Sequence, residues 1–398
     1  MEYIFSDKLS ALKPSAIREI FKSLTDPSII SFAAGNPNPL SFPVEALAKI
    51  SADIFASDAA YALQYGITEG YAPLRESIAA RIYEKFGIGR EFDQTIVTTG
   101  GQQGIELACK AFCNEGDAVI CENPSFIGAL NAFRSNGART IGVPLRADGI
   151  DLTVLEETLR TEKKAKLLYL IPTFQNPSGI TSTLKNRRAV YALAKKYGVV
   201  ILEDNPYGEL RFRGEDIPTF KSMDEEGIVI YNGSYSKVLS AGMRIGFLMA
   251  QKDVLQRLTV AKQFSDCHTN IFFQIVTDEW LKTADVNAHI AKIRKIYRDR
   301  CDFMLKMLDE HMDKRVTYTR PDGGLFLWCT LPEGCDSQVL ADLALRKGVA
   351  FVPGRDFMVD SDAPCRDFRL NFSTPTYENM EKGILRLCDA VSEYLSDK

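Results

Sequence analysis

Short apolar segments alternate with amphipathic helical segments from about residue 95 to residue 250, and this alternation constrains the fold more than any other feature. Continuous apolar strands separated by helices are typical of a mostly parallel sheet that is covered on both faces. Ligands of such α/β sheets bind at the carboxyl ends of the strands. The expected strands cover residues 95–99, 118–121, 167–171, 199–203, 228–231 and 245–249, and the expected helices cover residues 102–114, 126–136, 152–162 and 183–197.

A single apolar stripe at helical spacing predicts one long helix after this region. Beyond residue 314, expected strands at 325–330, 349–352 and 369–372 mix with helices at 337–347 and 377–395, which predicts a smaller α+β domain. The first 45 residues are irregular and rich in proline, so we expect them to pack on the small domain or on another subunit. The predicted organisation is an N-terminal arm (1–45), a large domain (46–290) and a small C-terminal domain (291–398). The stripe consists of Val286, Ile290, Ile293, Tyr297, Cys301, Met304 and Leu308.

Composition excludes several classes of function. The chain has 398 residues, 45% of them hydrophobic, which is ordinary for a globular protein long enough for two domains. Its net charge of −4 arises from interspersed charges without a basic block, so we expect no nucleic-acid partner. No apolar run approaches the roughly 20 residues of a membrane helix, and the first residues show no signal-peptide pattern. Nine scattered cysteines and only three histidines predict a reduced, cytoplasmic protein without a metal site.

One lysine lies between hydroxyl groups in Ser234-Tyr235-Ser236-Lys237, and an arginine follows in Gly242-Met243-Arg244-Ile245-Gly246. The apolar segments on either side place this lysine on a loop between two strands. The hydroxyls, glycines and arginine around it are suited to a phosphate group. An amine beside a phosphate pocket favours a Schiff base with the phosphorylated aldehyde pyridoxal phosphate (PLP).

A second segment suited to phosphate is Thr98-Thr99-Gly100-Gly101-Gln102-Gln103, between an expected strand and an expected helix. Its glycines allow close backbone approach, and the start of the helix presents free N–H groups to an anion. A glycine pair at a strand end is also typical of a simple tight turn. Ser234, Ser236 and Arg244 would complete the phosphate site.

Two further strand ends carry groups suited to a pyridine ring. The expected strand at 199–203 is followed by Asp204, and Tyr207 comes three residues later. The aspartate suits a protonated pyridine nitrogen and the tyrosine suits the 3-oxygen of the ring, although an aspartate here is equally suited to capping a turn. Asn176 follows the strand at 167–171 and suits the same oxygen, or a plain Asn-Pro turn.

Phe126 and Arg369 add an aromatic ring and a buried charge. Phe126 follows the expected strand at 118–121 and is either a ring that stacks on a flat heterocycle or a part of the core. Arg369 lies within an apolar strand, and a buried guanidinium needs an anion. That anion is either a structural carboxylate or the α-carboxylate of a substrate.

In this order along the chain, these motifs resemble those of fold-type I PLP-dependent aminotransferases of class I/II. The resemblance extends from about Pro14 to the C-terminus and is nearest to the branch of α-aminoadipate, kynurenine and aromatic aminotransferases. It implies a three-layer PLP-transferase fold, a homodimer with shared active sites, and a role for each matching residue. These implied roles are Lys237 as Schiff-base lysine, Asp204 on the pyridine nitrogen, Tyr207 and Asn176 on the 3-oxygen, Phe126 as stacking ring, Arg369 on the substrate's α-carboxylate, Gly101, Gln102, Ser234, Ser236 and Arg244 on the phosphate, and Tyr65 on the phosphate of the neighbouring subunit.

Three residues depart from the family's pattern without removing a chemical role. Phe126 stands where a tyrosine is common, so stacking is retained while a hydroxyl contact is lost. Ala241 stands where a proline is frequent, and Asn205 stands where a second acid is frequent.

The reaction that the resemblance implies is a ping-pong transfer of an amino group from an L-amino acid to a 2-oxo acid. Arg18 resembles an arginine that binds a distal carboxylate, which would make glutamate and 2-oxoglutarate one substrate pair, or else it is an exposed residue on an amphipathic helix. Gly35 resembles part of a loop that closes over the substrate. The alternative is a PLP-dependent carbon–sulfur β-lyase, which needs nearly the same residues and would release pyruvate and a thiol from cystathionine.

Overall fold

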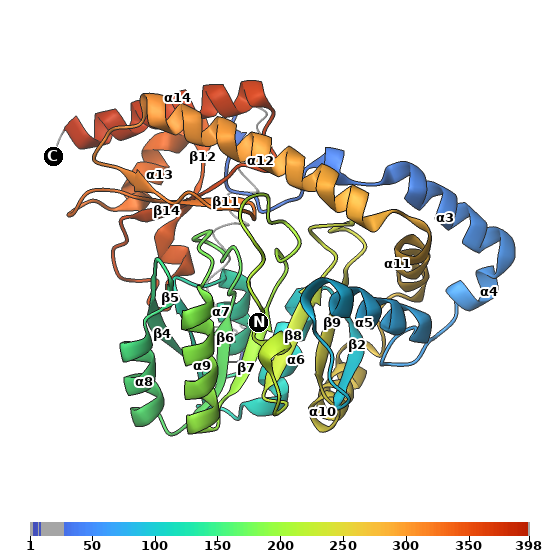
Figure 1. The fold of residues 1–398 in the computed structure, drawn as a ribbon. Helices are drawn as coiled ribbons and strands as arrows, with labels where there is room; N and C mark the ends of the chain where they lie inside the picture. Colours follow the sequence, from blue (N-terminus) through green and yellow to red (C-terminus); the bar gives the residue numbers. More distant parts are fainter. Residues whose placement is uncertain (1–2, 7, 9–27, 397–398) are drawn as a thin grey trace.

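The structure, a computed structural model, describes residues 3–6, 8 and 28–396 and is built around one eight-stranded sheet (Figure 1). The strand order is β2-β9-β8-β7-β6-β3-β4-β5. Strands β8, β7, β6, β3 and β4 are parallel to one another, whereas β9 runs antiparallel to both its neighbours and β5 runs antiparallel to β4. The strands are β2 (Asp93–Thr99), β3 (Ala118–Asn123), β4 (Arg139–Arg146), β5 (Gly149–Ile150), β6 (Ala165–Leu170), β7 (Val200–Asp204), β8 (Val229–Ser234) and β9 (Ile245–Gln251).

The predicted α/β fold is confirmed, and all six strands expected in this region are present within a few residues of their expected limits. Strands β4 and β5 were not expected from the sequence. Gly142 and Pro144 interrupt the apolar pattern of β4, and most of its side chains are only partly buried, so it lacks the continuous apolar run of the central strands.

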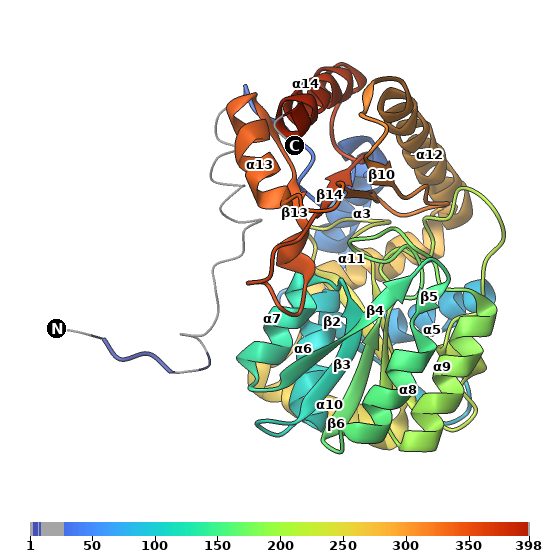
Figure 2. The same cartoon turned by 90° about the vertical axis from the view of Figure 1, so that its left-hand side faces the viewer.

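Helices cover both faces of this sheet, as Figure 2 shows. One face carries α6 (Gly101–Phe112), α7 (Ile127–Ser135) and α10 (Lys252–Asp266), and the other carries α5 (Ala72–Phe86), α8 (Leu152–Thr161) and α9 (Leu184–Tyr197). Local sequence sets the helix limits, because Asp151 and Thr183 accept hydrogen bonds from N–H groups of the first turns of α8 and α9. Gly198 ends α9 in the left-handed conformation.

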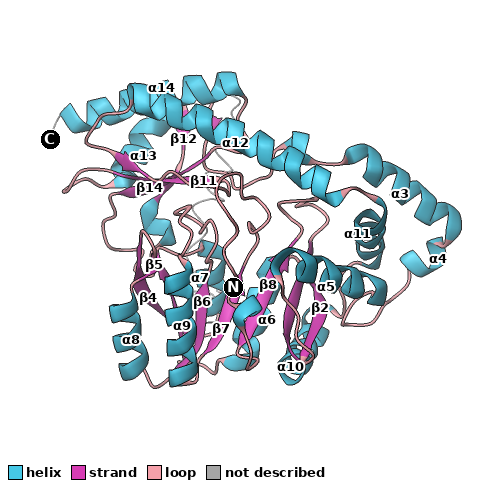
Figure 3. Ribbon diagram, viewed as in Figure 1, coloured by secondary structure: helices cyan, strands magenta, loops and turns pink. Residues whose placement is uncertain are grey.

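A second, antiparallel sheet has the order β10-β11-β14-β13 and lies beyond the carboxyl edge of the large sheet (Figure 3). The expected strand at 349–352 is split in the structure into β12, which pairs with β1, and β13, which joins the antiparallel sheet. This pairing brings the chain around residue 30 against the C-terminal segments. The elements are β1 (Ile30–Ser31), β10 (Thr317–Tyr318), β11 (Phe326–Thr330), α13 (Ser337–Arg346), β12 (Val349–Ala350), β13 (Val352–Pro353), η3 (Gly354–Phe357), β14 (Asp367–Asn371) and α14 (Tyr377–Ser396).

The long helix expected from the apolar stripe is α12 (Val286–His311), and six of the seven stripe residues are buried. It runs beside α14 above the large sheet in Figure 1. The expected domain limit at 290/291 lies within α12 and the limit at 45/46 lies in the first turn of α3 (Val44–Ser57), so the three-part division stays a prediction. The remaining elements are η1 (Pro39–Ser41), α4 (Ala59–Ala62), η2 (Lys221–Met223) and α11 (Ile271–Thr283).

Neither a membrane-spanning helix nor a metal-binding cluster is found among the described residues. No helix within them has both the length and the apolar character needed to cross a membrane. In the same part of the chain, no group of three or more His, Cys, Asp or Glu side chains is arranged to hold a metal ion.

Candidate active site

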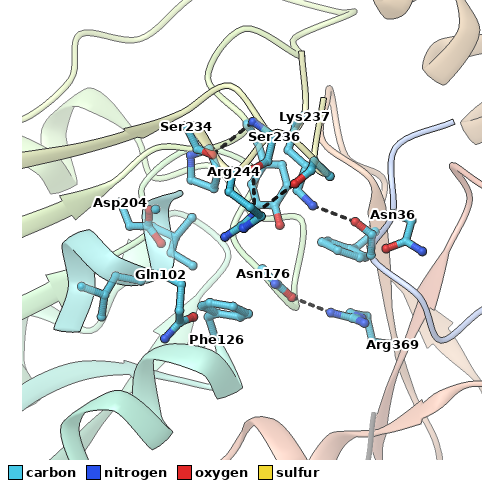
Figure 4. A pocket seen from close by; sticks show the side chains of 18 residues that line it. Asn36, Gln102, Phe126, Asn176, Asp204, Ser234, Ser236, Lys237, Arg244 and Arg369 are labelled. Atoms are coloured by element: carbon cyan, nitrogen blue, oxygen red, sulfur yellow. Dashed lines mark hydrogen bonds between the residues drawn. The ribbon is translucent and has the colours of Figure 1, made fainter. Parts of the chain in front are cut away.

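A cavity of about 350 Å³ lies between the carboxyl edge of the large sheet and the antiparallel sheet. Twelve of the fourteen residues predicted for the site line it (Figure 4). Most of them lie at or just after the ends of β3, β6, β7 and β8, which are far apart in sequence but meet at one sheet edge, whereas Arg369 comes from β14. These residues are Gly35, Gly101, Gln102, Phe126, Asn176, Asp204, Tyr207, Ser234, Ser236, Lys237, Arg244 and Arg369.

The Lys237 amine points into this cavity and donates a hydrogen bond to the carbonyl oxygen of Gly35 at 2.8 Å. The surrounding protein lowers the pKa of Lys237 to about 8, because it removes water that would solvate the ammonium charge. Arg369 and Arg244 lower this pKa further by charge repulsion. The amine is therefore uncharged far more often near neutral pH than an ordinary lysine, and the neutral form can act as a nucleophile or a base.

A group of hydroxyls, glycines and one guanidinium lies on one side of the lysine. Arg244, just before β9, donates hydrogen bonds to the hydroxyl of Ser236 at 3.3 Å and to the carbonyl oxygen of Ala241 at 3.2 Å. Gly100 has a φ of 74°, and a Cβ atom at that position would clash with the Arg244 guanidinium. Gly100 precedes Gly101, the first residue of α6, and both Gly101 and Gln102 line the cavity, so the helix start with its free N–H groups lies at the cavity. The group is suited to a phosphate.

Asp204 ends β7 with its side chain buried. Its carboxylate accepts hydrogen bonds from the Tyr169 hydroxyl at 2.8 Å and from the Asn232 amide at 2.9 Å. Burial raises the pKa of Asp204 to about 7, and these two donors oppose that rise. The hydrogen bonds come from side chains of neighbouring strands, so Asp204 does not act as a turn cap here.

Arg369 extends from β14 into the cavity with only 2% of its surface exposed. It donates to the side-chain oxygen of Asn176 at 2.8 Å, as Figure 4 shows, and to the carbonyl oxygen of Ala33 at 2.6 Å. The guanidinium carbon lies 4.2 Å from the ring centre of Phe326 and 4.9 Å from that of Phe357. Burial lowers the pKa of Arg369 to about 10. Among the described residues its hydrogen bonds go to neutral oxygens and its Nε has no partner, so no structural carboxylate neutralises it.

Phe126 and Tyr207 add two aromatic rings. Phe126 precedes α7 and lies beside Gln102 in Figure 4. Gln102 donates to the carbonyl oxygen of Gly128 at 2.8 Å, and a Cβ atom on Gly128 would clash with both side chains. Tyr207 is buried, its hydroxyl interacts with the Asn176 side chain, and burial raises its pKa.

Two predicted site residues remain, Tyr65 and Arg18. Tyr65 does not line the cavity; its side chain is 85% exposed and its ring lies 5.7 Å from that of His268. Arg18 falls outside the described residues. The departures from the family pattern are accommodated, because Ala241 supplies a carbonyl to Arg244 and Asn205 donates to the Tyr231 hydroxyl at 3.0 Å.

Phe326, Tyr169 and Asn232 belong to the site or its surroundings but were not predicted from the sequence. Phe326 is an apolar strand residue without a local signal of function, and Tyr169 is likewise hidden in an apolar run. Asn232 offered a weak signal, because it is a polar residue near the end of an expected buried strand, like Asp204 on the neighbouring strand.

The donor set fits PLP. The cavity holds the partly deprotonated Lys237 amine and the buried Asp204 carboxylate. It also holds the glycines, hydroxyls and guanidinium around Arg244, which are suited to a phosphate. It also holds a second guanidinium, that of Arg369, with an unpaired buried Nε.

Comparison with known proteins assigns the family. The family model described as "Aminotransferase class I and II" matches residues 27–387. The chain belongs to this aminotransferase family. Aromatic-amino-acid aminotransferase 1 of Thermococcus litoralis is 40% identical to it over 396 residues, which cover 98% of this chain and 95% of that protein.

Two solved aminotransferases have the same fold as this one. Pyrococcus horikoshii kynurenine aminotransferase, in complex with PMP, KYN as substrates and KYA as products, aligns with a TM-score of 0.94 and 39% identity over 98% of this chain and 97% of that chain. LysN, the α-aminoadipate aminotransferase of Thermus thermophilus complexed with N-(5'-phosphopyridoxyl)-L-leucine, aligns with a TM-score of 0.91 and 38% identity over 99% and 98% of the two chains. The predicted PLP-dependent transaminase that acts on amino acids and 2-oxo acids is thereby confirmed.

Proposed function

We propose that the cavity around Lys237 is the site of transamination and that its lining residues have the roles expected from the sequence. The observation that carries this proposal is that the Lys237 amine, the Asp204 carboxylate and the Arg369 guanidinium all face one cavity. Lys237 would hold the cofactor covalently, and Asp204 would pair with its ring nitrogen. Tyr207 and Asn176 would contact the 3-oxygen, Phe126 would stack on the ring, and the phosphate would lie among Gly101, Gln102, Ser234, Ser236 and Arg244.

When bound, PLP supplies an electrophilic carbon and a ring that accepts electrons from the substrate's α-carbon. Arg369 then binds the α-carboxylate of the amino acid through its fork of N–H groups. This would orient the α-proton toward Lys237, which the substrate's amino group would have displaced from the cofactor. The lowered pKa of the freed Lys237 amine would allow it to remove that proton and then to deliver it to the electrophilic carbon that PLP supplies.

The loop at Gly35 supports a role in closing the site. The Gly35 carbonyl oxygen accepts a hydrogen bond from Lys237, and the Ala33 carbonyl oxygen accepts one from Arg369. The same loop therefore contacts both the base and the residue that would bind the substrate's carboxylate, and we propose that it excludes water when a substrate binds.

A single-turnover experiment tests this proposal. The PLP form of the enzyme is mixed with one L-amino acid at a time, and loss of the visible cofactor band is followed together with the 2-oxo acid that is released. Borohydride reduction followed by peptide mapping should attach the cofactor to Lys237, and Lys237→Ala should abolish both the tag and the turnover. A tag on another residue would refute the assignment.

Glutamate and 2-oxoglutarate are the substrate pair that we propose for one half of the cycle, on the basis of the expected role of Arg18. Replacement of Arg18 by glutamine should raise the KM for 2-oxoglutarate, which has a distal carboxylate. The KM for a 2-oxo acid with an uncharged side chain should stay the same. Equal changes for both acceptors would exclude this role.

We also propose that the enzyme is a homodimer in which Tyr65 reaches the partner's site. The support is that Tyr65 and Phe264 are 85% and 86% exposed and that the Tyr65 ring lies 5.7 Å from that of His268, four residues after Phe264, because exposed apolar side chains that gather in a patch mark protein interfaces. Leu63 and Ile67 are exposed beside Tyr65. A cytoplasmic location is proposed in addition, because all nine cysteines are free thiols.

Mixed dimers test the shared site. Dimers made only of Lys237→Ala subunits or only of Tyr65→Phe subunits should be impaired. If Tyr65 acts across the interface, a mixed dimer has one intact site, in which one subunit supplies Lys237 and its partner supplies Tyr65. Random exchange should then restore about a quarter of the wild-type site number, since half of the dimers are mixed and each has one intact site. A mixture no more active than its separate components would show that Tyr65 serves its own subunit or neither.

A further inference from the structure

The Asp204 carboxylate is held by donors from both neighbouring strands. The Tyr169 hydroxyl in β6 donates to one carboxylate oxygen at 2.8 Å, and the Asn232 amide in β8 donates to the other at 2.9 Å. Neither residue is among the residues that line the cavity. Both therefore contact Asp204 from behind the site.

The sheet register explains why these two side chains meet Asp204. Asn232 lies directly opposite Asp204 in the parallel pair of β7 and β8. Tyr169 is opposite Leu202, which lies two residues before Asp204 on the same strand face. A two-residue offset is roughly 6.6 Å along a strand, and the long tyrosine side chain bridges it where a shorter hydroxyl residue would not.

Both donors are also fixed by their own surroundings. The Asn232 amide donates a second hydrogen bond to the carbonyl oxygen of Gly101 at 3.0 Å, which sets the orientation of the amide. Gly104 lets α6 approach this side chain, because a Cβ atom at that position would clash with Asn232. The Tyr169 side chain is fully buried, and its ring packs edge-on at 5.4 Å from that of Phe133.

We propose that Tyr169 and Asn232 are positioning residues that hold the Asp204 carboxylate against the ring nitrogen of the cofactor. This inference rests on the proposed role of Asp204. Burial raises the pKa of Asp204 toward neutrality, and hydrogen bonds from two fixed donors favour the charged form. Without a donor, the buried group gains stability by taking up a proton, and a neutral carboxyl is a poorer partner for a pyridinium.

A comparison of two ligands isolates this effect from general damage. The apo-enzyme is titrated with PLP and with 1-deaza-PLP, in which a carbon replaces the ring nitrogen, and both dissociation constants are measured by fluorescence. Wild type should bind PLP more tightly than the deaza compound. Tyr169→Phe keeps the packed ring and removes only the hydroxyl, so it should weaken PLP binding by about tenfold and leave the affinity for the deaza compound unchanged.

Tyr191→Phe is the matched control. The Tyr191 hydroxyl donates to Asp224 at 3.1 Å, and this tyrosine-aspartate pair lies outside the cavity. Its loss should change neither dissociation constant. Asn232→Ala provides a second variant that removes the other donor, so the comparison can still be made if Tyr169→Phe does not fold.

The outcomes distinguish the role of Asp204 from that of its two donors. Equal binding of the two ligands by wild type would refute the role of Asp204 itself. Discrimination by wild type that is fully retained in Tyr169→Phe and Asn232→Ala would overturn the positioning role while leaving Asp204 in place. An equal loss of affinity for both ligands would also overturn it, because that result indicates only a structural role.

Discussion

Replacing Arg369 by lysine keeps a positive charge in the cavity but removes the planar fork of donors. The guanidinium lies close to the rings of Phe326 and Phe357, and it uses two N–H groups to hold Asn176 and the carbonyl of Ala33. A lysine ammonium is a point charge that cannot retain both protein contacts and still offer two parallel bonds to a carboxylate. The substitution should therefore impair substrate binding more than it disturbs the charge of the site.

The expected magnitude follows from the bonds that are lost. One charge-assisted hydrogen bond contributes roughly 1.5–3 kcal/mol, and each 1.36 kcal/mol corresponds to a factor of ten in kcat/KM. Arg369→Lys should thus lower kcat/KM for an L-amino acid by about 10- to 100-fold, since one of the two bonds to the carboxylate is lost.

The assay compares an L-amino acid with the amine that has the same side chain but no carboxylate. The slow reaction of the amine should be the same in wild type and in Arg369→Lys, because the amine has no carboxylate for residue 369 to bind. Arg211→Lys is the matched control, since Arg211 is also buried over an aromatic ring, at 4.7 Å from Phe174, but does not line the cavity. Equal losses for the amine and the amino acid, or no loss for either, would refute the assignment of Arg369.

Two further predictions concern the buried lysines. The rate at which apo-enzyme takes up PLP should rise with pH through about 8, because only the neutral Lys237 amine reacts with an aldehyde and burial lowers its pKa to that value. Arg369→Gln removes a repelling charge, so the midpoint should move to higher pH in a stopped-flow absorbance titration; a wild-type midpoint at the ordinary value of 10.5 would contradict this. Lys221 is fully buried and pairs with Asp93 at 2.6 Å and Asp224 at 2.9 Å, so Lys221→Met should lower the free energy of unfolding by about 3–5 kcal/mol in urea titrations. Because this cluster lies outside the cavity, the kcat of the folded variant should be unchanged, and a stability equal to wild type would show that the ion pairs contribute nothing.

Sequence patterns were sufficient for the parts of the site that local signals mark. The strand before Asp204, the glycines at Gly100 and Gly101, and the hydroxyls beside Lys237 each follow from residue type and from the position at a strand end. Because parallel strands end at one edge, this order along the chain already places the groups near one another. The structure brings them to one cavity for that reason.

Other features depend on pairings between distant segments that no local pattern reports. The loop at Gly35 contacts Lys237, and this contact requires β1 to pair with β12, more than 300 residues later. Strand β4 was missed because it is half-exposed and interrupted by Gly142 and Pro144. The placement of Arg369 close to two aromatic rings depends on the fold of the antiparallel sheet and of η3, each of which supplies one ring.

The hydrogen bonds behind Asp204 likewise depend on strand pairings that no local pattern reports, and they affect how the cavity would receive the cofactor. One Asn232 amide donates both to the Gly101 carbonyl, at the phosphate end of the cavity, and to Asp204, at the end expected to meet the ring nitrogen. A single side chain thus links the two ends, and the strand pairing of β7 with β8 sets where it lies. On the other side, Asn176 joins the Tyr207 hydroxyl to Arg369, the residue expected to bind the substrate's carboxylate. Because Asn232 and Asn176 are buried and each contacts groups at two ends of the cavity, a ligand that fits one end meets a partner already held at the other, which is the preorganisation that transamination requires.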